Sequence, residues 1–563
     1  MSIDIETYRL KAQEAIEYVF VKEYHNSLGI PMPIVKILLP DDANYSTGQY
    51  YITIDKTWQI HLNFGKLPIS YHEFQNEVKV LTRLEIEHYM CCPFDVITHF
   101  RMLKRIKDVY YKHFSHLGIN IKYACGAISN QAADIIVDTK NYYRHSKETL
   151  KSEIDWIKIG ANISACPRHC KLMFLTKEAI WKEDLGINET DPEFLKIVHQ
   201  LADSFTKNGI EDKSSFLDKV EEYAEIFFKL YVEDQKNPQQ SGQQGSQQQS
   251  GQQGSQQQSG QWGVGRPKDG DEHGNAFVVA VPDKVKEAIE VLAEENSVEE
   301  FIDLLAIAGI IGMSDKQKGV LWFNVQSANI IPIVEFSNTG NKSSYTYPSV
   351  WRIGDPIEEL DLMLTYMTSP RLIPGMTTKK WEYVSNDDNG TESKQMDLLL
   401  VVDTSGSMGS AMKESANMHQ AVLASYGILS YFESTKSKVA FIGFSDKIDA
   451  YVDWSDKYDD VRERLLTNGH GGTKFPISRI KSTLDVRSRD LVTVLITDGD
   501  LGNINESVSY FRDYLNDDNK LYIFLLVGSK SLHSYEPLKN IGAKIYNANN
   551  ANEFCDMVLT DME

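Results

Sequence analysis

Short apolar runs alternate with helical patterns over the last third of the chain. The apolar runs are 398–402, 438–444, 491–497 and 521–527. Between them, segments such as 411–433 and 504–515 carry apolar residues at helical spacing. Unbroken apolar runs of this length are typical of strands that are buried on both faces of a parallel sheet. The pattern therefore predicts an α/β domain with a doubly wound parallel sheet, in which ligands bind at the carboxyl ends of the strands.

A different pattern fills residues 1–235. Short runs separated by polar turns, at 35–40, 49–55 and 59–64, predict strands. The segment 72–90 carries apolar residues three and four positions apart, which predicts a helix that Pro93 brings to an end. Further helix-like segments follow at 95–114, 130–138 and 194–231. We therefore expect a separate α+β domain in this part of the chain.

Residues 236–275 form a flexible linker by composition. The nonapeptide SGQQGSQQQ occurs twice, from 241 and from 250, and offers no apolar side chain to a core. After it, 281–312 predicts a pair of helices, with Ser297 and Glu300 as a capping box for the second. From Trp322 onward the sequence predicts irregular or β structure. We expect 276–395 to pack as an extension on a C-terminal domain, 396–563.

The first apolar run of the C-terminal domain ends in the sequence DTSGS. Asp403, Ser405 and Ser407 alternate there, so that three oxygen atoms can be aimed at one point. Thr473 offers a hydroxyl on a glycine-rich turn, and Asp498 follows the third apolar run. Oxygen ligands in this arrangement suit hard divalent cations such as Mg²⁺. The Asp-x-Ser-x-Ser pattern alone is also typical of a polar loop or a helix cap that binds no metal.

The order of these three motifs resembles the metal-ion-dependent adhesion site of von Willebrand factor A domains, which have a Rossmann-like fold. The resemblance covers roughly 396–563. It implies that Asp403, Ser405, Ser407, Thr473 and Asp498 hold Mg²⁺, or else Mn²⁺ or Ca²⁺, some of them through water. It also implies a partner protein whose Asp or Glu completes the coordination of the metal.

A second candidate site lies in the predicted helix 72–90. The sequence LEIEH places Glu85 and His88 as in the His-Glu-x-x-His motif of zincins, but Leu84 stands where the first histidine would be. In that motif two histidines bind zinc and the glutamate activates water. The region 35–144 resembles zincin-type metallopeptidases, and the resemblance implies Asp134 on a later helix as a further zinc ligand.

The missing histidine favours a degenerate, non-catalytic domain. His88 and Asp134 are two ligands, and a zinc site would need Glu85, Asp138 or a cysteine to complete it. In the alternative hypothesis, a zinc metallopeptidase with non-standard ligands, Glu85 is the catalytic base. A structural zinc could also bind a set of cysteine and histidine side chains, although buried free thiols are the commoner case. Those residues are Cys91, Cys92, Cys166, His169 and Cys170.

Composition narrows the functional classes. The formal net charge of −21 argues against binding to nucleic acids or to anionic membranes. No run approaches the roughly eighteen apolar residues of a membrane-spanning helix, and the first residues lack the pattern of a secretory signal. The sequence therefore predicts a cytoplasmic protein whose six cysteines are thiols.

The pairing of a C-terminal A domain with a zincin-like region resembles the partners of MoxR-type AAA+ ATPases. It implies an adaptor that links such an ATPase to a client in protein remodelling or assembly. The chain has no Walker A sequence, so ATPase activity would come from the partner. We expect a metal-dependent protein-binding adaptor. The zinc metallopeptidase is the alternative, and the lack of a signal sequence disfavours an extracellular adhesin.

Overall fold

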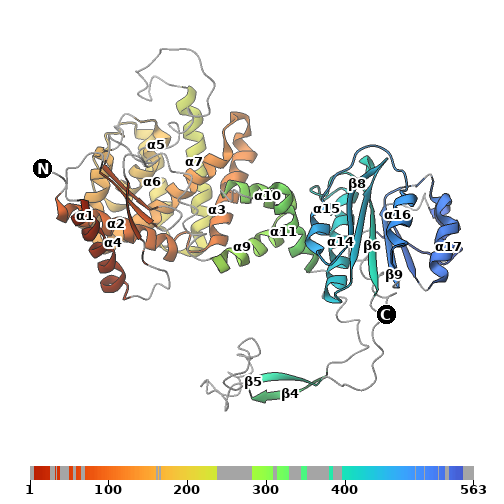
Figure 1. Ribbon diagram of the computed structural model, residues 1–563. Helices are drawn as coiled ribbons and strands as arrows, with labels where there is room; N and C mark the ends of the chain where they lie inside the picture. The colour runs from red at the N-terminus through yellow and green to blue at the C-terminus, as the bar shows by residue number, and fades with distance from the viewer. Residues whose placement is uncertain are drawn as a thin grey trace. The chain divides into compact units, whose positions relative to one another are not determined.

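The chain divides into two compact units, Met1–Ser314 and Asp315–Glu563, and each is described by itself. Figure 1 shows the computed structural model. It describes residues 5–25, 32, 34–38, 50–54, 59–64, 70–159, 163, 166–236, 282–308, 313–328, 344–350, 379–384, 396–487, 490–499, 501, 503–517, 519–526 and 532–548. The predicted linker 236–275 lies outside these residues, apart from its first position. No helix in the described ranges has both the length and the apolar character needed to cross a membrane.

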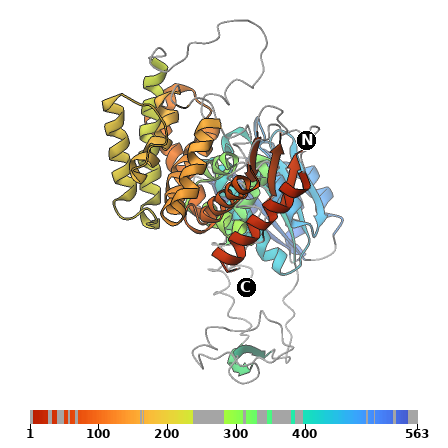
Figure 2. The ribbon, with the colours of Figure 1, turned by 90° about the vertical axis from the view of Figure 1, so that its left-hand side faces the viewer.

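Unit 1 begins with a small mixed sheet beside two helices. Strands β1 (Ile34–Leu38), β2 (Tyr50–Ile54) and β3 (Gln59–Phe64) are ordered β1-β3-β2. β1 runs parallel to β3, and β2 runs antiparallel to it. Helix α1 (Ile5–Glu17) packs against β1 and against α2 (Tyr71–Met90), and Figure 2 shows it beside the strands. The three strands expected from the sequence are confirmed.

Helix α2 forms where the sequence predicts a helix. Its first turn is closed by a capping box, in which the Glu73 nitrogen donates to Ser70 Oγ over 3.3 Å and the Ser70 nitrogen donates to Glu73 Oε2 over 3.2 Å. Phe74 and Val78 lie on its buried face, in one core with residues of α1. The helix ends just before Pro93, which cannot continue it.

The rest of unit 1 is helical. Its longer helices are α3 (Val96–Val109), α4 (Ile121–Ile159), α5 (Arg168–Trp181), α6 (Pro192–Thr206), α7 (Phe216–Lys236), α9 (Pro282–Glu295) and α10 (Val298–Ile307). Short helical turns lie at Tyr18–Glu23, Tyr110–Phe114, Ser115–Leu117 and Lys213–Ser215. Helix α3 packs against both α4 and α7. Helix α4 is kinked at His145, whose φ of −136° and ψ of 48° are not helical.

Helices α9 and α10 lie within the predicted extension 276–395, but they do not belong to the unit on which that extension was expected to pack. Both pack on α3 in unit 1, and Glu300 of α10 pairs with Lys107 of α3 over 3.0 Å. Ser297 caps α10 by accepting a hydrogen bond from the Glu300 nitrogen over 3.2 Å, while the Glu300 carboxylate turns to Lys107. The pair of helices is therefore confirmed, but it belongs to unit 1, and the extension is divided between the two units.

Unit 2 is an α/β unit built on a six-stranded, mostly parallel sheet. The strands are β6 (Asp397–Asp403), β7 (Val439–Phe444), β8 (Ile448–Ser455), β9 (Leu491–Thr497), β10 (Lys520–Leu526) and β11 (Lys544–Ala548), in the order β11-β10-β9-β6-β7-β8. β8 alone of these six runs antiparallel to its neighbour. The sequence predicted a parallel sheet, and the structure departs from that prediction at this edge alone among the six strands. The connection from β7 to β8 is a tight turn, which joins only antiparallel strands.

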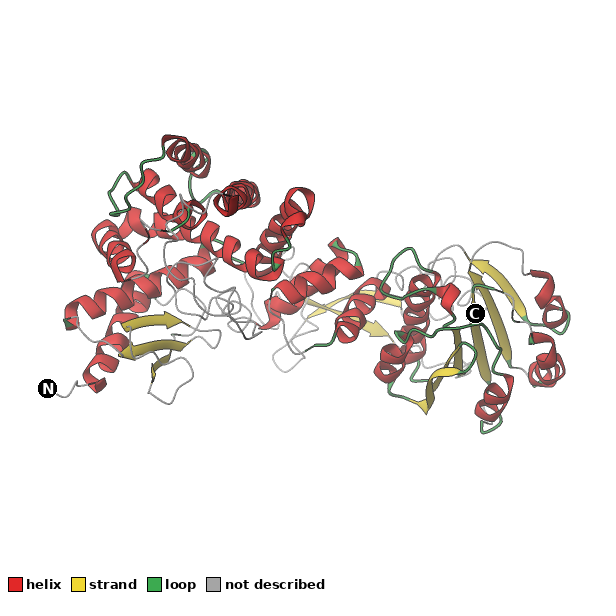
Figure 3. Ribbon diagram, turned by 90° about the horizontal axis from the view of Figure 1, so that it is seen from above, coloured by secondary structure: helices red, strands yellow, loops and turns green. Residues whose placement is uncertain are grey.

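Helices cover both faces of this sheet. They are α14 (Asn417–Ser434), α15 (Tyr458–Leu465), α16 (Ile477–Leu484), α17 (Val508–Asn516) and α18 (Leu532–Lys539), with 3₁₀ turns at Gly406–Met408 and Ile504–Ser507. α14 and α15 lie on one face, and α16 and α17 lie on the other (Figure 1). Figure 3 shows helices on both sides of the sheet. On the second face, Leu399, Ile442 and Leu495 of the strands share a core with Phe511 and Tyr535 of the helices. The doubly wound arrangement is therefore confirmed.

The segment before the sheet contains a helix where irregular or β structure was predicted. Helix α11 (Asp315–Ala328) includes Trp322 and packs on α14 and α15. The aromatic residues favour a strand locally, but burial of Trp322 and Phe323 against α14 determines the outcome. Two further strands, β4 (Ser344–Val350) and β5 (Lys379–Val384), follow it as an antiparallel pair.

Candidate metal centre

The two acidic residues of the predicted oxygen site lie at the carboxyl ends of neighbouring strands. Asp403 is the last residue of β6, and Asp498 follows Thr497, the last residue of β9. β6 and β9 are parallel neighbours, and the strand order runs in opposite directions from this pair. In open α/β sheets, ligands bind outside the carboxyl ends of the strands at such a switch point. The topology therefore brings both carboxylates to the edge where a ligand is expected.

Asp403 is fully buried and held by two hydrogen bonds. Thr497 donates from Oγ1 to Asp403 Oδ2 over 2.7 Å, and the Ser405 backbone nitrogen donates to Oδ1 over 2.8 Å. Burial raises the pKa of Asp403, although these hydrogen bonds oppose the rise. A cation bound beside such a carboxylate offsets the cost of burying its charge.

Ser405, Ser407 and Asp498 continue this network as a chain of oxygen atoms. Ser405 Oγ lies 3.1 Å from Ser407 Oγ, and Ser407 Oγ donates to Asp498 Oδ1 over 3.1 Å. Asn417, the first residue of α14, donates from Nδ2 to Asp498 Oδ2 over 3.1 Å. Ser405 is buried and Ser407 is exposed, so the chain of oxygens leads from the interior to solvent.

A glycine-rich turn brings Thr473 to the same edge of the sheet. The Gly406 nitrogen donates to the Gly471 carbonyl oxygen over 3.2 Å, and the Gly472 nitrogen donates to Asp446 Oδ2 over 2.9 Å. Thr473 is partly exposed, and its hydroxyl makes no hydrogen bond with any other residue that the structure describes. The turn is therefore fixed beside the Asp-x-Ser-x-Ser loop.

The oxygen atoms gathered at this edge fit a hard divalent cation. Mg²⁺ binds through one or two carboxylates and neutral oxygens, and it keeps several waters. Asp403 and Asp498 would supply the charge, and the hydroxyls of Ser405, Ser407 and Thr473 would supply neutral ligands. Mn²⁺ and Ca²⁺ accept the same oxygen ligands. The five predicted residues are therefore compatible with the predicted ion, and direct hydrogen bonds already link four of them.

Three residues that shape this site were not predicted: Thr497, Asn417 and Asp446. A hydroxyl residue placed directly before Asp498, at the end of an apolar run, was an available signal for Thr497. Asn417 was hidden because the helix was expected to start at residue 411, whereas α14 begins at Asn417. Asp446 left no local signal, because its role depends on a turn from a distant part of the chain.

The N-terminal candidate site holds a histidine–aspartate pair. His88 Nε2 on α2 lies 3.2 Å from Asp134 Oδ1 on α4, and His88 Nδ1 lies 2.9 Å from the Cys92 carbonyl oxygen. Burial alone would lower the pKa of His88, but the hydrogen bond and charge of Asp134, together with the charge of Glu85, raise it to about 9. The structure thus brings together the two residues proposed as remnant zinc ligands.

Among the residues that the structure describes, no third side chain completes a zinc site with this pair. Leu84 is 4% exposed, and its apolar side chain occupies the first ligand position of the motif. Asp138, considered as a replacement ligand, pairs with Lys177 Nζ over 2.9 Å instead. Across the described ranges, no three or more His, Cys, Asp or Glu side chains gather so that they could hold a metal ion. The oxygen site at Asp403 differs in kind, because most of its proposed ligands are serine and threonine hydroxyls.

The cysteines that the structure describes are free thiols. Burial raises the pKa of Cys91 to about 11 and that of Cys170 to about 12, so both are protonated at neutral pH. His169, the histidine between Cys166 and Cys170, directs Nδ1 to Asp234 Oδ2 over 2.8 Å. The described cysteines are therefore buried or partly buried thiols, as the sequence predicted.

No family model matches the sequence, and no curated protein matches it significantly. A functional conclusion must therefore come from the geometry and chemistry of the sites.

Proposed function

We propose that unit 2 is a metal-dependent protein-binding module in which Asp403, Ser405, Ser407, Thr473 and Asp498 bind Mg²⁺. The observation that carries the proposal is the chain of oxygens that runs from buried Asp403 to Asp498 at the switch point of the sheet. The bound ion would supply a positive charge with exchangeable coordination positions, for which an Asp or Glu of a partner protein is a suitable ligand.

Groups around the carboxylates prepare the site before a cation arrives. Thr497 fixes one oxygen of Asp403, and Asn417 fixes one oxygen of Asp498. Such outer hydrogen bonds orient ligands and strengthen metal binding. The exposed Ser407 lies at the solvent end of the chain of oxygens, which is the side from which a partner would approach.

The organisation of the chain extends this proposal to an adaptor. The resemblance to partners of MoxR-type AAA+ ATPases suggests that unit 2 binds an acidic group of an ATPase or of its client, in protein remodelling or assembly. In this proposal unit 1 is a degenerate zincin-like part that is not catalytic. The buried Leu84 at the ligand position and the engagement of both ring nitrogens of His88 support that reading.

Metal binding can be tested with two aspartates at opposite ends of β6. Asp397, the first residue of the strand, is 1% exposed and pairs with Arg487 over 2.5 Å. Asp403→Asn should abolish Mn²⁺ binding, measured by electron paramagnetic resonance of the free ion. Asp397→Asn removes an equally buried charge from the same strand and should leave Mn²⁺ binding intact. Normal Mn²⁺ affinity in Asp403→Asn would refute the proposed site.

Partner binding requires a separate comparison. A purified MoxR-type ATPase should be retained by the full chain in Mg²⁺ and released by EDTA, and Asp403→Asn should fail to retain it. Asp397→Asn is again the control for folding. Equal retention with and without EDTA would show that the interaction does not use the metal.

The peptidase alternative is tested at Glu85. Elemental analysis of the purified chain should find no stoichiometric zinc, and Glu85→Gln should behave as the wild type in every partner assay. Bound zinc, together with a peptide-cleaving activity that Glu85→Gln loses, would establish the alternative instead.

A further inference from the structure

Helix α11 lies outside the strand–helix alternation of unit 2 and yet packs on two of its helices, α14 and α15. Its buried face includes Lys318, Gly319, Trp322 and Phe323. Through this face, α11 is connected to two loops, 409–416 and 466–473. The first loop directly follows Ser405 and Ser407, and the second one ends at Thr473.

The first connection runs through His419 of α14. The rings of Trp322 and Phe323 both lie 5.2 Å from the His419 ring, centroid to centroid. His419 Nδ1 lies 2.8 Å from the Ala411 carbonyl oxygen. The aromatic pair of α11 thus fixes a ring that contacts the loop after Ser407.

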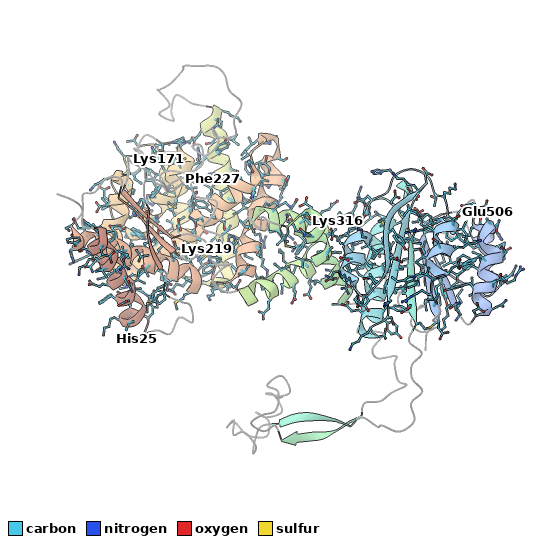
Figure 4. The ribbon with its side chains drawn as sticks, viewed as in Figure 1. His25, Lys171, Lys219, Phe227, Lys316 and Glu506 are labelled. Carbon is cyan, nitrogen blue, oxygen red and sulfur yellow. The ribbon has the colours of Figure 1, made fainter. Side chains whose placement is uncertain are left out.

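The second connection is direct and involves both loops. A methyl group added at Gly319 would lie 2.5 Å from Met412 Cε and 3.4 Å from Leu466 Cδ1. Lys316 of α11, which is labelled in Figure 4, also contacts the second loop. Its Nζ donates to Thr467 Oγ1 over 3.3 Å. Glycine at position 319 therefore lets the helix approach the two loops at one point.

The two loops also contact each other next to the oxygen atoms of the proposed ion site. The Gly406 nitrogen donates to the Gly471 carbonyl oxygen over 3.2 Å. Asn468 Nδ2 lies 3.5 Å from Ser410 Oγ. A displacement of α11 would therefore be passed to both sides of the proposed ion site.

We propose that α11 is a positioning helix, and that its close approach at Gly319 sets the spacing between the loop of Ser405 and Ser407 and the loop of Thr473. The effect on metal affinity rests on the proposed function of unit 2, whereas the effect on the loops does not.

The test is a wedge at Gly319 in the full chain. Gly319→Leu places a large side chain against Met412 and Leu466, and leucine favours helix more than glycine, so melting of α11 is not the expected result. Gln317→Leu, at an exposed position of the same helix, is the matched control. The double variant Gly319→Leu with Met412→Ala removes the side chain that the wedge meets first, and should restore the wild-type behaviour.

Two measurements separate this inference from the proposed function. In metal-free protein, hydrogen exchange should accelerate at the amides of 405–412 and 466–473 in Gly319→Leu, while amides of β6 and β9 stay protected. Mn²⁺ affinity should fall about 10- to 100-fold, the range found when outer groups that orient metal ligands are lost. Both effects should be absent in Gln317→Leu and reversed in the double variant.

Unchanged exchange in either loop would overturn the inference, as would equal acceleration throughout the sheet. If wild-type protein takes up no Mn²⁺, the proposed function fails, and hydrogen exchange still decides whether α11 positions the loops. If Gly319→Leu does not fold, Gly319→Ala gives the same test with a smaller wedge. It should accelerate exchange in the loop that holds Met412, and unchanged exchange there would equally overturn the inference.

Discussion

Thr497 donates its hydroxyl to Asp403 over 2.7 Å and so joins the ends of two neighbouring strands, β9 and β6. Thr497 is itself fully buried. The carboxylate of Asp403, a proposed metal ligand, is therefore oriented by Thr497, which was not among the predicted ligands.

Replacing Thr497 by valine should weaken metal binding. The change keeps the shape of the side chain but leaves Asp403 without a buried hydrogen-bond donor. Loss of such a bond typically costs about 1–2 kcal/mol of unfolding free energy, and loss of an orienting group costs about 10-fold or more in metal affinity. Urea unfolding and Mn²⁺ titration would measure the two effects.

Thr493→Val is the matched control for that change. Thr493 lies on the same strand, is buried and hydrogen-bonds to Tyr514 Oη over 3.0 Å, away from Asp403. It should lower stability by a similar amount and leave Mn²⁺ affinity unchanged. Equal losses of Mn²⁺ affinity in the two variants would mean that strand stability, and not the contact with Asp403, controls the site.

Alanine at Gly471 should displace the turn that carries Thr473. The φ of +107° strains any residue with a Cβ atom, typically by about 1–3 kcal/mol. The added methyl group would also collide with the Asp446 carboxylate, which holds this turn through the Gly472 nitrogen. We expect lower stability together with lower Mn²⁺ affinity.

Gly209→Ala separates strain from displacement. Gly209 has a φ of +92°, but a methyl group there meets no described atom within 4 Å. This variant should lose some stability while Mn²⁺ binding stays normal. If Gly471→Ala also binds Mn²⁺ normally, the turn does not contribute to the site.

Lys177→Met should strongly destabilise unit 1. Lys177 is 1% exposed and pairs with Asp138 over 2.9 Å and with Glu153. Removing one partner of a buried ion pair leaves an uncompensated charge, at a cost of about 3–5 kcal/mol. Lys151→Met should cost less than about 1 kcal/mol. Lys151 pairs with Glu73 over 3.1 Å, and the two side chains are 50% and 45% exposed. Chemical denaturation of both variants would reveal whether burial makes this difference.

Glu77 should make the stability of unit 1 depend on pH. Burial raises its pKa from 4.5 to about 7, although Ser152 donates a hydrogen bond to its carboxylate over 2.8 Å. The folded state therefore retains a proton that the unfolded chain releases. The resulting stabilisation is complete below the unfolded pKa and is lost as the pH rises through about 7.

Glu77→Gln removes this titration and should reduce the loss of stability between pH 5 and pH 8, measured by urea unfolding. In Glu73→Gln the loss should match that of the wild type, because the Lys151 hydrogen bond lowers the pKa of Glu73 and moves its titration below this window. An unchanged pH profile in Glu77→Gln would show that the carboxyl group is not buried as described.

The sequence predicted the centre of unit 2 well because β6 and β9 are buried on both faces and read as unbroken apolar runs. The edge was harder to predict. β8 combines polar residues such as Asp449 and Asp453 with half-buried apolar ones, so neither face gives a clear periodic signal. Its antiparallel direction follows from the tight turn after β7, which sequence periodicity does not reveal.

The same distinction holds for the candidate site. Asp403, Ser405 and Ser407 were predictable because they lie close together in the sequence, at the end of β6 and in the loop that follows it. The contacts of Thr497 with Asp403 and of Asn417 with Asp498 depend on which strands and helices become neighbours. Helix α11 was missed for a related reason, because its aromatic residues find their partners on α14, far along the chain.

The start of unit 2 at Asp315 has a consequence for how this part of the chain can be transplanted. A fragment cut at residue 396 would contain all six strands, yet it would expose His419 and Tyr426, which Trp322 and Phe323 now contact. In such a fragment the aromatic surface that α11 covers would be exposed to solvent, and the fragment would tend to aggregate. The smallest segment that evolution or protein engineering could transfer as a working module therefore begins at α11. It includes the whole sequence between α11 and β6.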